Sequence, residues 1–240
     1  MGGESLPIQA GREGGRGSPR LSIVIPLYNE AEALPHLKEA LDEVLDRESL
    51  EAEILFIDDG SFDESPALLD HFAAEDPRVR VVHFRRNRGK SPALDTGFRL
   101  ARGEVVITMD ADLQDDPAEI PNLIARLEEG YDLVSGWKRK RHDPLTKTLP
   151  SRLFNLVARK VSGVKLHDIN CGLKAYRREV LPTIRVYGEL HRFIPILVAA
   201  QGWRVGEMVV QHHPRRWGKT KFGAWRLLYG FLDLLSVVFL

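Results

Sequence analysis

The sequence predicts a single α/β domain with a mostly parallel central sheet flanked by helices, followed by an amphipathic or membrane-associated C-terminal helix. Short apolar runs alternate with stretches of helical apolar spacing, a pattern typical of a parallel sheet wound by right-handed crossovers. The 240 residues are enough for one good-sized core. We divide the chain into a disordered N-terminal arm (1–20), the α/β domain (21–222) and the C-terminal helix (223–240).

The first strand is expected at residues 21–27, where LSIVIPL is a short apolar run. A helix is expected to follow within 29–45, where apolar residues recur at helical spacing: Leu34, Leu37, Leu41, Val44 and Leu45. The alternation continues to residue 110, with strands at 52–59, 79–84 and 104–110 and helices at 65–75 and 91–101. It is this alternation that predicts the parallel sheet.

The second half of the chain is less regular. A helix is expected at 117–130, ending at Gly130, a residue type suited to the position that follows a helix C-terminus. One strand is expected at 131–137 and another within 203–214, whereas 150–200 is mixed and mostly helical in period.

Both ends of the chain differ in composition from the domain between them. Residues 1–20 are rich in Gly and Arg and lack the apolar segment of a signal peptide, so a disordered arm is expected. Residues 223–240 are the most apolar stretch but carry Arg226 and Asp233, and are shorter than the roughly 20 apolar residues of a spanning helix. Three interpretations remain: a packed helix, an interfacial helix, or a segment leading to spans absent from this chain; we favour the last two.

Charge and cysteine content limit the partners only weakly. The 34 basic residues balance the 34 acidic ones, so net charge indicates no partner, and no nucleic acid is expected. Basic residues gather in KRKRH (138–142) and RRWGKTK (215–221), which are either phosphate-binding patches or solvated loops. The single cysteine, Cys171, excludes an internal disulfide and is expected to be a buried thiol.

Three polar clusters each follow a predicted strand. They are Tyr28-Asn29-Glu30, Asp58-Asp59-Gly60-Ser61 and Asp110-Ala111-Asp112. Ligands of open α/β sheets bind beyond the carboxyl ends of the strands, at a switch in strand order. The three clusters are therefore expected to converge at one edge of the sheet and to form the functional site.

The last cluster has the chemistry of a hard-metal site. Asp110 and Asp112 are two apart, so an extended backbone places both carboxylates on one side, with Gln114 two further on. Such oxygens suit Mg²⁺ or Mn²⁺, with substrate phosphates as further ligands. Asp115 and Asp116, before Pro117, are expected to cap a helix.

Other common site patterns are missing. The sequence has neither a dinucleotide-binding glycine fingerprint nor a P-loop, so a nucleotide would have to be held by acids, metal and basic side chains. His212 and His213 have no partners with zinc-ligand spacing, and a structural role is expected for them.

The motifs in their order resemble inverting family-2 glycosyltransferases of the GT-A fold, which is Rossmann-like. More narrowly they resemble the polyprenyl-phosphate branch, such as dolichyl-phosphate mannose synthase and its bacterial undecaprenyl-phosphate relatives. The resemblance covers about residues 21–226 and rests on PLYNE (26–30), IDDGSFD (57–63), NRGKSPALDTGF (87–98), MDADLQDDP (109–117), SGWKRKR (135–141) and HDINCGLKAYRREV (167–180). DDGS and DxD mark the wider superfamily, whereas LQDDP, NCGLKAYRR and RRWGKTKFG indicate the branch.

The resemblance implies a donor site for a nucleotide diphosphate sugar. The residues implied around the nucleoside are Pro26, Tyr28, Glu30, Phe56 and Asp58, with Asp58 reading the base. Asp110 and Ala111 are implied to contact the nucleotide near a Mg²⁺ or Mn²⁺ ion, for which Asp110, Asp112 and Gln114 are the candidate ligands. The diphosphate is expected to meet Lys138, which stands where the family has an arginine, its neighbour Arg139, and Arg215 and Lys221 on either side of Gly218.

The resemblance also implies an acceptor site. Lys147, Ser151 and Arg152 lie where the family binds the acceptor phosphate. A phosphate monoester is already largely anionic at neutral pH, because its second pKa is about 6, so it needs positioning more than a base. Asp168 is the best remaining carboxylate for a base or orienting role, with a turn or cap aspartate as the alternative.

The leading hypothesis is metal-dependent, inverting transfer of a hexose from a UDP- or GDP-sugar to dolichyl or undecaprenyl phosphate at the cytoplasmic membrane face. The protein would be peripheral or anchored through its C-terminal segment, with homo-oligomers or a membrane subunit as further partners. Alternatives are a saccharide or protein hydroxyl acceptor, nucleotidyl transfer, or a non-catalytic nucleotide-sugar-binding homologue. The sequence leaves the sugar, the base and the polyprenol open.

Overall fold

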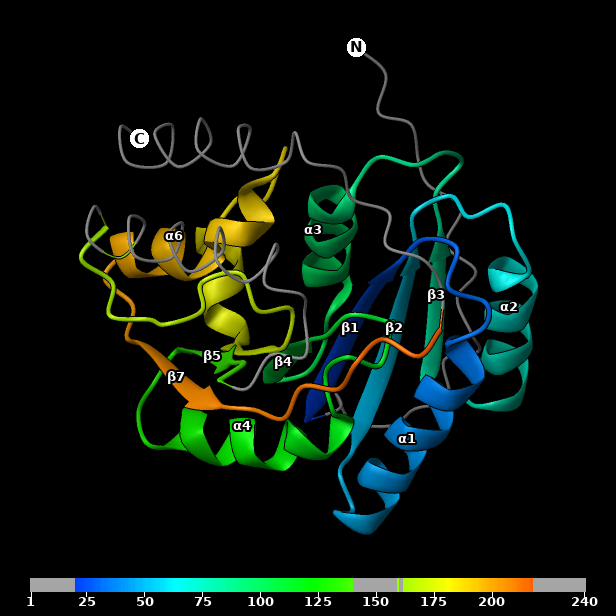
Figure 1. The fold of residues 1–240 in the computed structure, drawn as a ribbon, viewed down its shortest axis with the longest axis horizontal. Coiled ribbons are helices and arrows are strands. Elements are labelled where there is room, and N and C mark those ends of the chain that lie inside the picture. Colours follow the sequence, from blue (N-terminus) through cyan, green and yellow to red (C-terminus); the bar gives the residue numbers. More distant parts are fainter. Residues whose placement is uncertain (1–19, 140–158, 160–161, 218–240) are drawn as a thin grey trace.

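Seven strands form one sheet in the part of the chain that the computed structural model describes, residues 20–139, 159 and 162–217 (Figure 1). The strands are β1 (Leu21–Leu27), β2 (Ala52–Asp58), β3 (Val79–His83), β4 (Val105–Thr108), β5 (Leu133–Trp137), β6 (Lys174–Arg177) and β7 (Val205–Val209). The α-helices are α1 (Leu34–Arg47), α2 (Ser65–Glu75), α3 (Lys90–Leu100), α4 (Ile120–Glu128) and α6 (Ile194–Ala200). The 3-10 helices are η1 (Pro117–Glu119), η2 (Arg178–Thr183) and η3 (Leu190–Phe193).

The sheet is mostly parallel, as predicted. Its order is β3-β2-β1-β4-β6-β5-β7, and only β6 runs antiparallel to its neighbours, β4 and β5. The chain winds outward from β1 to β3 and then returns to place β4 on the other side of β1. The switch in strand order therefore falls between β1 and β4, where a ligand site is expected.

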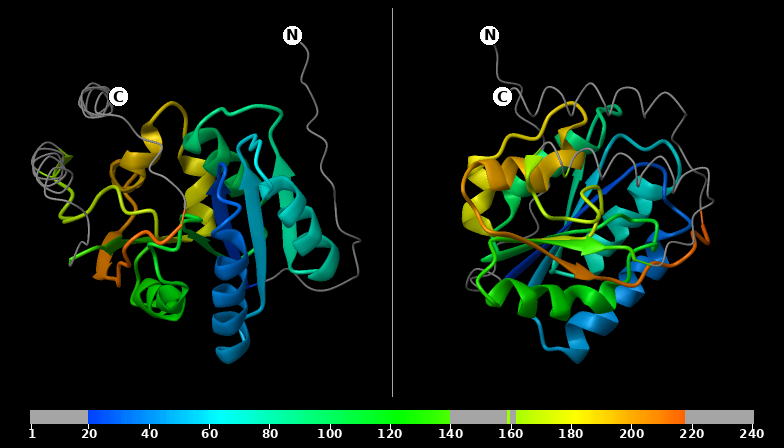
Figure 2. Two further views of the ribbon diagram at one scale, coloured as in Figure 1. Left: turned by 45° about the vertical axis from the view of Figure 1, so that its right-hand side comes forward. Right: turned by 60° about the vertical axis from the view of Figure 1, so that its left-hand side comes forward.

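The sequence of β1 is almost continuously apolar because both faces of the strand are buried. Ile23 and Ile25 pack in one core cluster with leucines of α1, whereas Val24 packs in a second cluster with Leu94 and Phe98 of α3. Helices α1 and α4 accordingly lie on one side of the sheet and α3 and α6 on the other (Figure 2). Gly130 has φ of +97° after α4, the left-handed conformation expected after a helix end.

One strand was not predicted from the sequence. Strand β6 has only four residues, lies within a segment of helical period, and begins with the lysine Lys174. Nothing local to this segment marks it as a strand, because its stability comes from pairing with β4 and β5 on both sides.

The predicted N-terminal arm up to residue 19 and the predicted C-terminal helix lie outside the described residues. Within 20–139, 159 and 162–217, no helix combines the length and the apolar character needed to cross a membrane.

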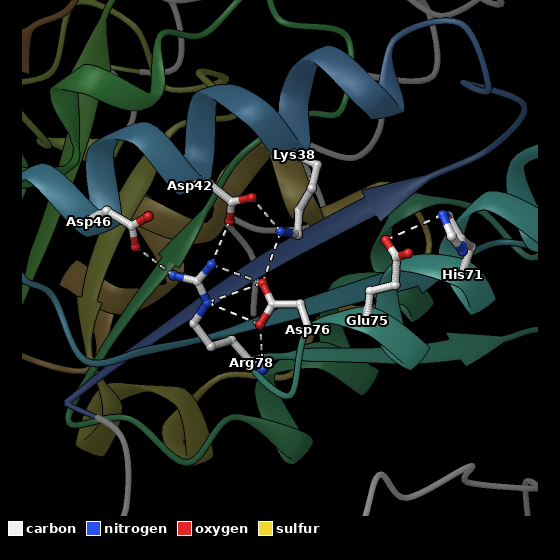
Figure 3. Close-up of polar contacts among 7 residues, drawn as sticks. All are labelled: Lys38, Asp42, Asp46, His71, Glu75, Asp76 and Arg78. Carbon is white, nitrogen blue, oxygen red and sulfur yellow. Dashed lines mark hydrogen bonds and ion pairs between the residues drawn. The ribbon is translucent and has the colours of Figure 1, made fainter.

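A network of charges joins α1 to the residues just before β3, at the edge of the sheet opposite the carboxyl ends of the parallel strands (Figure 3). Arg78 pairs with Asp76 at 2.9 Å, with Asp42 at 2.8 Å and with Asp46 at 3.0 Å, and Lys38 lies 2.9 Å from Asp76. Burial opposes ionisation of Asp76, but Arg78 and Lys38 lower its pKa to about 2. The network therefore stabilises the ionised form of Asp76.

The network predicts a loss of stability in acid. The pKa of Asp76 is lowered from 3.8 to about 2 on folding, so its contribution is complete above pH 3.8 and disappears as the pH falls toward 2. The shift corresponds to about 2 kcal/mol. Asp76→Asn is expected to lower the free energy of unfolding at pH 7 by about that amount and to flatten its dependence between pH 4 and 2.

Urea unfolding followed by circular dichroism at pH 7, 4 and 3 measures both effects. Glu75→Gln is the matched control, because Glu75 forms only an exposed pair with His71, and it should change stability by less than about 0.5 kcal/mol. Equal pH dependence in Asp76→Asn and wild type would contradict the assignment.

Candidate functional site

The loops that follow β1 and β2 are tied together at the carboxyl edge of the sheet. The Asn29 amide donates to Ser61 Oγ at 2.8 Å, and the Phe62 amide donates to Asn29 Oδ1 at 2.9 Å. The Ala31 amide donates to Asp63 Oδ2 at 3.2 Å. The first two predicted clusters therefore converge, as expected from the sequence.

Asp58 lies at the bottom of this junction and is 1% exposed. Its carboxylate accepts from the Ser61 amide at 3.0 Å and lies 2.8 Å from His83 Nδ1. Burial opposes ionisation of Asp58, but His83 and Ser61 hold its pKa below the usual range, and Asp58 in turn raises the pKa of His83. A hydrogen-bonded Asp58–His83 pair is therefore built into the end of the sheet beside β1.

The other residues predicted around a nucleoside are divided between edge and core. Tyr28 is half-buried and meets the exposed ring of Phe62 edge-on, with ring centroids 6.0 Å apart. Pro26 is buried within β1, and Phe56 is buried within β2, where it packs on Phe72. The structure thus leaves Tyr28 partly exposed after β1 and places Pro26 and Phe56 in the core.

Asp110 and Asp112 follow β4, and each is paired with a different cation. Lys90, at the start of α3, forms an ion pair with Asp110. Arg215 lies 2.5 Å from Asp112 and 3.6 Å from Glu30, so it also links the loops after β1 and β4. All three predicted clusters therefore meet at the switch point between β1 and β4.

The two carboxylates influence each other's ionisation. Burial opposes ionisation of Asp110, but Lys90, with Lys138 and Lys174, holds its pKa below the usual range. Burial, and then the neighbouring Asp110 charge, raise the pKa of Asp112, with Arg215 acting in the opposite direction. Two adjacent carboxylates repel each other when both are ionised, and one of them is therefore difficult to ionise. A divalent cation bound between them would reduce this repulsion.

A cation at this pair would need ligands beyond the protein. Among the described residues, no group of three or more Asp, Glu, His or Cys side chains is arranged to hold a metal ion. Gln114 contributes its backbone to the local turn, since its amide donates to Asp112 Oδ1 at 3.1 Å. Carboxylates with water and phosphate oxygens are the usual surroundings of Mg²⁺, so the residues fit a phosphate-bound cation.

The backbone directly after Asp112 is strained. Leu113 has φ of +55°, which is uncommon for a residue with a branched side chain. Asn29, in the loop after β1, has φ of +51°. Strained backbone of this kind persists where the surrounding structure imposes it and is concentrated at functional sites.

Asp115 and Asp116 have different roles, and the prediction that both cap a helix is wrong for Asp115. Asp116 does cap η1, accepting from the Ala118 amide at 2.9 Å. Asp115 is fully buried, its backbone bridges His212, and its carboxylate lies 2.7 Å from Lys138 Nζ. Burial opposes the charge of Lys138, but Asp115 holds its pKa above the usual range. Lys138, predicted to meet a diphosphate, is thus already balanced by Asp115.

The two acids predict different costs of neutralisation. Asp115→Asn leaves the Lys138 ammonium buried without its anion, so the free energy of unfolding is expected to fall by about 3 kcal/mol. Asp116→Asn retains a good capping side chain and should cost less than about 1 kcal/mol. Urea unfolding of both variants measures the difference. Equal losses would indicate that the pairing of Asp115 with Lys138 contributes no more to stability than the contacts of Asp116 do.

Residues Val210–Trp217, which we name the C-terminal strap, carry Arg215 to the acid pair. The strap leaves β7 and crosses in front of the sheet toward α1 (Figure 1). Its His213 amide donates to the Gln114 carbonyl at 2.9 Å, and His213 Nε2 lies 3.0 Å from Asp116. Trp217 stacks on His36 of α1, with ring centroids 4.5 Å apart. These contacts fix the strap across the site and support the structural role predicted for the histidine pair.

The remaining predicted residues are spread around the site. Asp168 is 1% exposed beside β5, where its carbonyl accepts from Ser135 Oγ at 3.4 Å. Cys171 is the expected buried thiol, and burial raises its pKa to about 12. Ala111 is buried and Arg139 is exposed. The predicted residues Lys147, Ser151, Arg152 and Lys221 lie outside the described residues.

Two lysines of the site had no predicted role. Lys90 lies within NRGKSPALDTGF, where nothing in the sequence shows that it reaches Asp110, 20 positions later. Lys174 is buried at the start of the unpredicted strand β6. Only the pairing of distant strands brings either lysine to the acids, so neither has a local signal.

Comparisons with known proteins identify the family of the chain. Residues 22–185 match the profile of the family described as "Glycosyl transferase family 2". The chain is 38% identical over 227 residues to the dodecaprenyl-phosphate galacturonate synthase of Rhizobium johnstonii, covering 92% of this chain and 67% of that protein. It is 42% identical over 217 residues to the undecaprenyl-phosphate 4-deoxy-4-formamido-L-arabinose transferase of Pseudomonas fluorescens, covering 90% of this chain and 64% of that one. The chain thus spans about two thirds of the length of these relatives.

Solved structures share the fold at low sequence identity. The mannosyltransferase PcManGT from Pyrobaculum calidifontis, in complex with GDP-Man and Mn²⁺, aligns with a TM-score of 0.64 at 23% identity, covering 92% of this chain and 65% of that one. The glucosyl-3-phosphoglycerate synthase from Mycobacterium tuberculosis, in complex with Mn²⁺ and UDP-Glc, aligns with a TM-score of 0.72 at 19% identity, covering 98% and 88%. At these identities the likeness extends to the fold alone.

Proposed function

The chain belongs to glycosyl transferase family 2, and from this premise we propose that it moves one sugar from a nucleoside diphosphate donor to a polyprenyl phosphate. The observation that carries the proposal is the pair Asp110 and Asp112 at the switch point, with Lys90 and Arg215 as neighbouring cations. Relatives that act on dodecaprenyl and undecaprenyl phosphate support the acceptor class. Solved structures of the same fold that hold GDP-Man or UDP-Glc with Mn²⁺ support the donor class.

The donor side must stabilise the charge that develops on the departing diphosphate. Asp110 and Asp112, with Gln114 beside them, would hold Mg²⁺ or Mn²⁺, which supplies positive charge to the phosphate oxygens. Arg215, which pairs with Asp112, is the proposed protein cation for the diphosphate, and Lys138 and Lys221 are the further candidates. Since Arg215 is held by the carboxylates of Asp112 and Glu30, a bound diphosphate would give its guanidinium an alternative partner.

The acceptor side requires orientation more than proton removal. The bond from the anomeric carbon to the diphosphate breaks as an oxygen of the lipid phosphate bonds to that carbon from the opposite face, which inverts its configuration. Because the acceptor phosphate is already ionised, no base has to remove a proton. Lys147, Ser151 and Arg152 are the proposed acceptor ligands. The burial of Asp168 suits an orienting role better than that of a base.

A lipid phosphate acceptor confines the reaction to a membrane surface. The enzyme would act at the cytoplasmic face, as a peripheral protein or anchored through residues 223–240. Apolar residues of that segment and the cations just before it have the composition of an interfacial helix. A homo-oligomer or a membrane subunit would serve the same purpose.

The proposal is tested by following a labelled sugar into lipid. Purified protein with undecaprenyl or dolichyl phosphate is incubated with UDP- or GDP-linked glucose, N-acetylglucosamine, galactose, mannose or galacturonate. Label is expected in the organic extract with Mn²⁺ or Mg²⁺ and not with EDTA. Transfer to a soluble saccharide but to neither lipid, with any donor, would contradict the acceptor assignment.

A further inference from the structure

Lys174 is a buried lysine for which the proposed reaction has no use. It opens β6, is 3% exposed, and donates from Nζ to the Cys171 carbonyl. Burial lowers its pKa, as expected for an ammonium removed from water. Lysine is almost never fully buried in proteins without a partner, so its position calls for a structural or functional reason.

The carbonyl that Lys174 holds belongs to the turn Asn170-Cys171-Gly172. The next carbonyl of the turn, that of Gly172, accepts from Thr108 Oγ1 at 2.9 Å. Thr108 of β4 and Lys174 of β6 are directly opposite each other in the antiparallel ladder. Two side chains from one cross-strand pair therefore hold two consecutive carbonyls of one turn.

This turn lies directly against the Asp110 carboxylate. A Cβ added to Gly172 would lie 2.6 Å from Asp110 Oδ2, so only glycine permits the approach. If the turn moved away from Asp110, this carboxylate would lose its packing contact with Gly172. The other side of Asp110 is occupied by Lys90.

A small cavity brings the same groups together. It is lined by Lys90, Thr108, Gly172 and Lys174 with His191 and other residues, and has room for about one water molecule. Both lysines therefore border the same small space as Thr108 and the turn, and Lys90 connects this group to Asp110 through its ion pair.

We propose that Lys174 is a positioning residue for the acid pair, holding the turn Asn170-Cys171-Gly172 against Asp110 through the Cys171 carbonyl. Thr108 performs the same task through the Gly172 carbonyl. The consequence for catalysis rests on the proposed function, in which Asp110 and Asp112 hold the cation, whereas the consequence for the turn does not. Groups that orient metal-binding side chains typically affect metal affinity or activity about 10- to 100-fold when they are removed.

The first test is hydrogen exchange of the ligand-free protein, read by mass spectrometry. Lys174→Met keeps a long apolar chain and removes the donor. Peptides covering 108–114 and 168–174 are expected to exchange about fivefold faster, since a typical hydrogen bond is lost. Lys38→Met, the same change in the network on α1, should leave these peptides unaffected. Unchanged exchange in Lys174→Met would overturn the proposal whatever the reaction is.

The second test is binding of Mn²⁺ in the presence of UDP or GDP, followed by the paramagnetic resonance of free Mn²⁺. Lys174→Met is expected to weaken binding about 10- to 100-fold. Thr108→Val should act in the same direction and Thr108→Ser should remain close to wild type, so the test survives if Lys174→Met does not fold. Wild-type affinity in both Lys174→Met and Thr108→Val would overturn the role at the acid pair. Absence of Mn²⁺ binding in wild type would count against the proposed function instead, and hydrogen exchange would still decide the role of Lys174 in the turn.

Discussion

Asp112→Asn is expected to reduce sugar transfer to lipid phosphate by at least about a hundredfold while leaving the protein folded. The substitution removes one charged oxygen donor from the acid pair, and with it most of the capacity to hold a cation beside the diphosphate. Stability should change by less than about 1 kcal/mol, because two effects oppose each other. The raised pKa shows that ionised Asp112 is disfavoured in the folded protein, whereas Arg215 loses a partner.

The assay measures labelled lipid formed at saturating donor and Mn²⁺, and urea unfolding measures stability. Asp116→Asn is the matched control, because it makes the same chemical change in the same loop but retains the cap of η1. It should retain nearly full activity. Activity of Asp112→Asn within threefold of wild type would remove the acid pair from the mechanism.

The fold was largely predictable because the strands at its centre, above all β1 and β2, are buried on both faces. Each apolar run of β1, β2 and β4 is bounded by polar residues, and those residues form the site, so locating the strands also located the acids. Strand β6 escaped prediction because its partners are distant in sequence and its first residue is Lys174. An inserted antiparallel strand of this kind depends on long-range pairing, which has no local signal.

The site was predictable in its acids and only partly in its cations. Asp110 and Asp112 follow from spacing alone, whereas the partner of each acid depends on tertiary contacts. Arg215 was singled out through the family pattern and lies beside Asp112 and Glu30, while its role toward a diphosphate stays a prediction, and Lys90 received no role. Asp115 was misassigned because a buried ion pair and a helix cap both present an aspartate before a proline, and only the burial of Lys138 distinguishes them. The acceptor residues remain predictions.

Arg215→Ala is expected to have two effects of opposite sign. The value of kcat/KM for the donor should fall about a hundredfold, because a cation near the diphosphate is lost. Binding of Mn²⁺ without nucleotide should instead become tighter, because the guanidinium that lies 2.5 Å from Asp112 no longer opposes a second cation there. Removing a residue that is needed only for folding would not tighten metal binding. The two opposite effects therefore distinguish a role at the diphosphate from a role in folding.

Arg216→Ala provides the control on the same strap, since Arg216 is exposed and adjacent in sequence. It should change neither measurement by more than about twofold. Arg215→Lys should restore charge but not the simultaneous reach to Glu30 and Asp112, so its turnover is expected between wild type and Arg215→Ala. Weaker Mn²⁺ binding in Arg215→Ala would mean that the guanidinium supports the acid pair rather than competing with the cation. The strap would then be part of a permanent site, and donor binding would not need to release it.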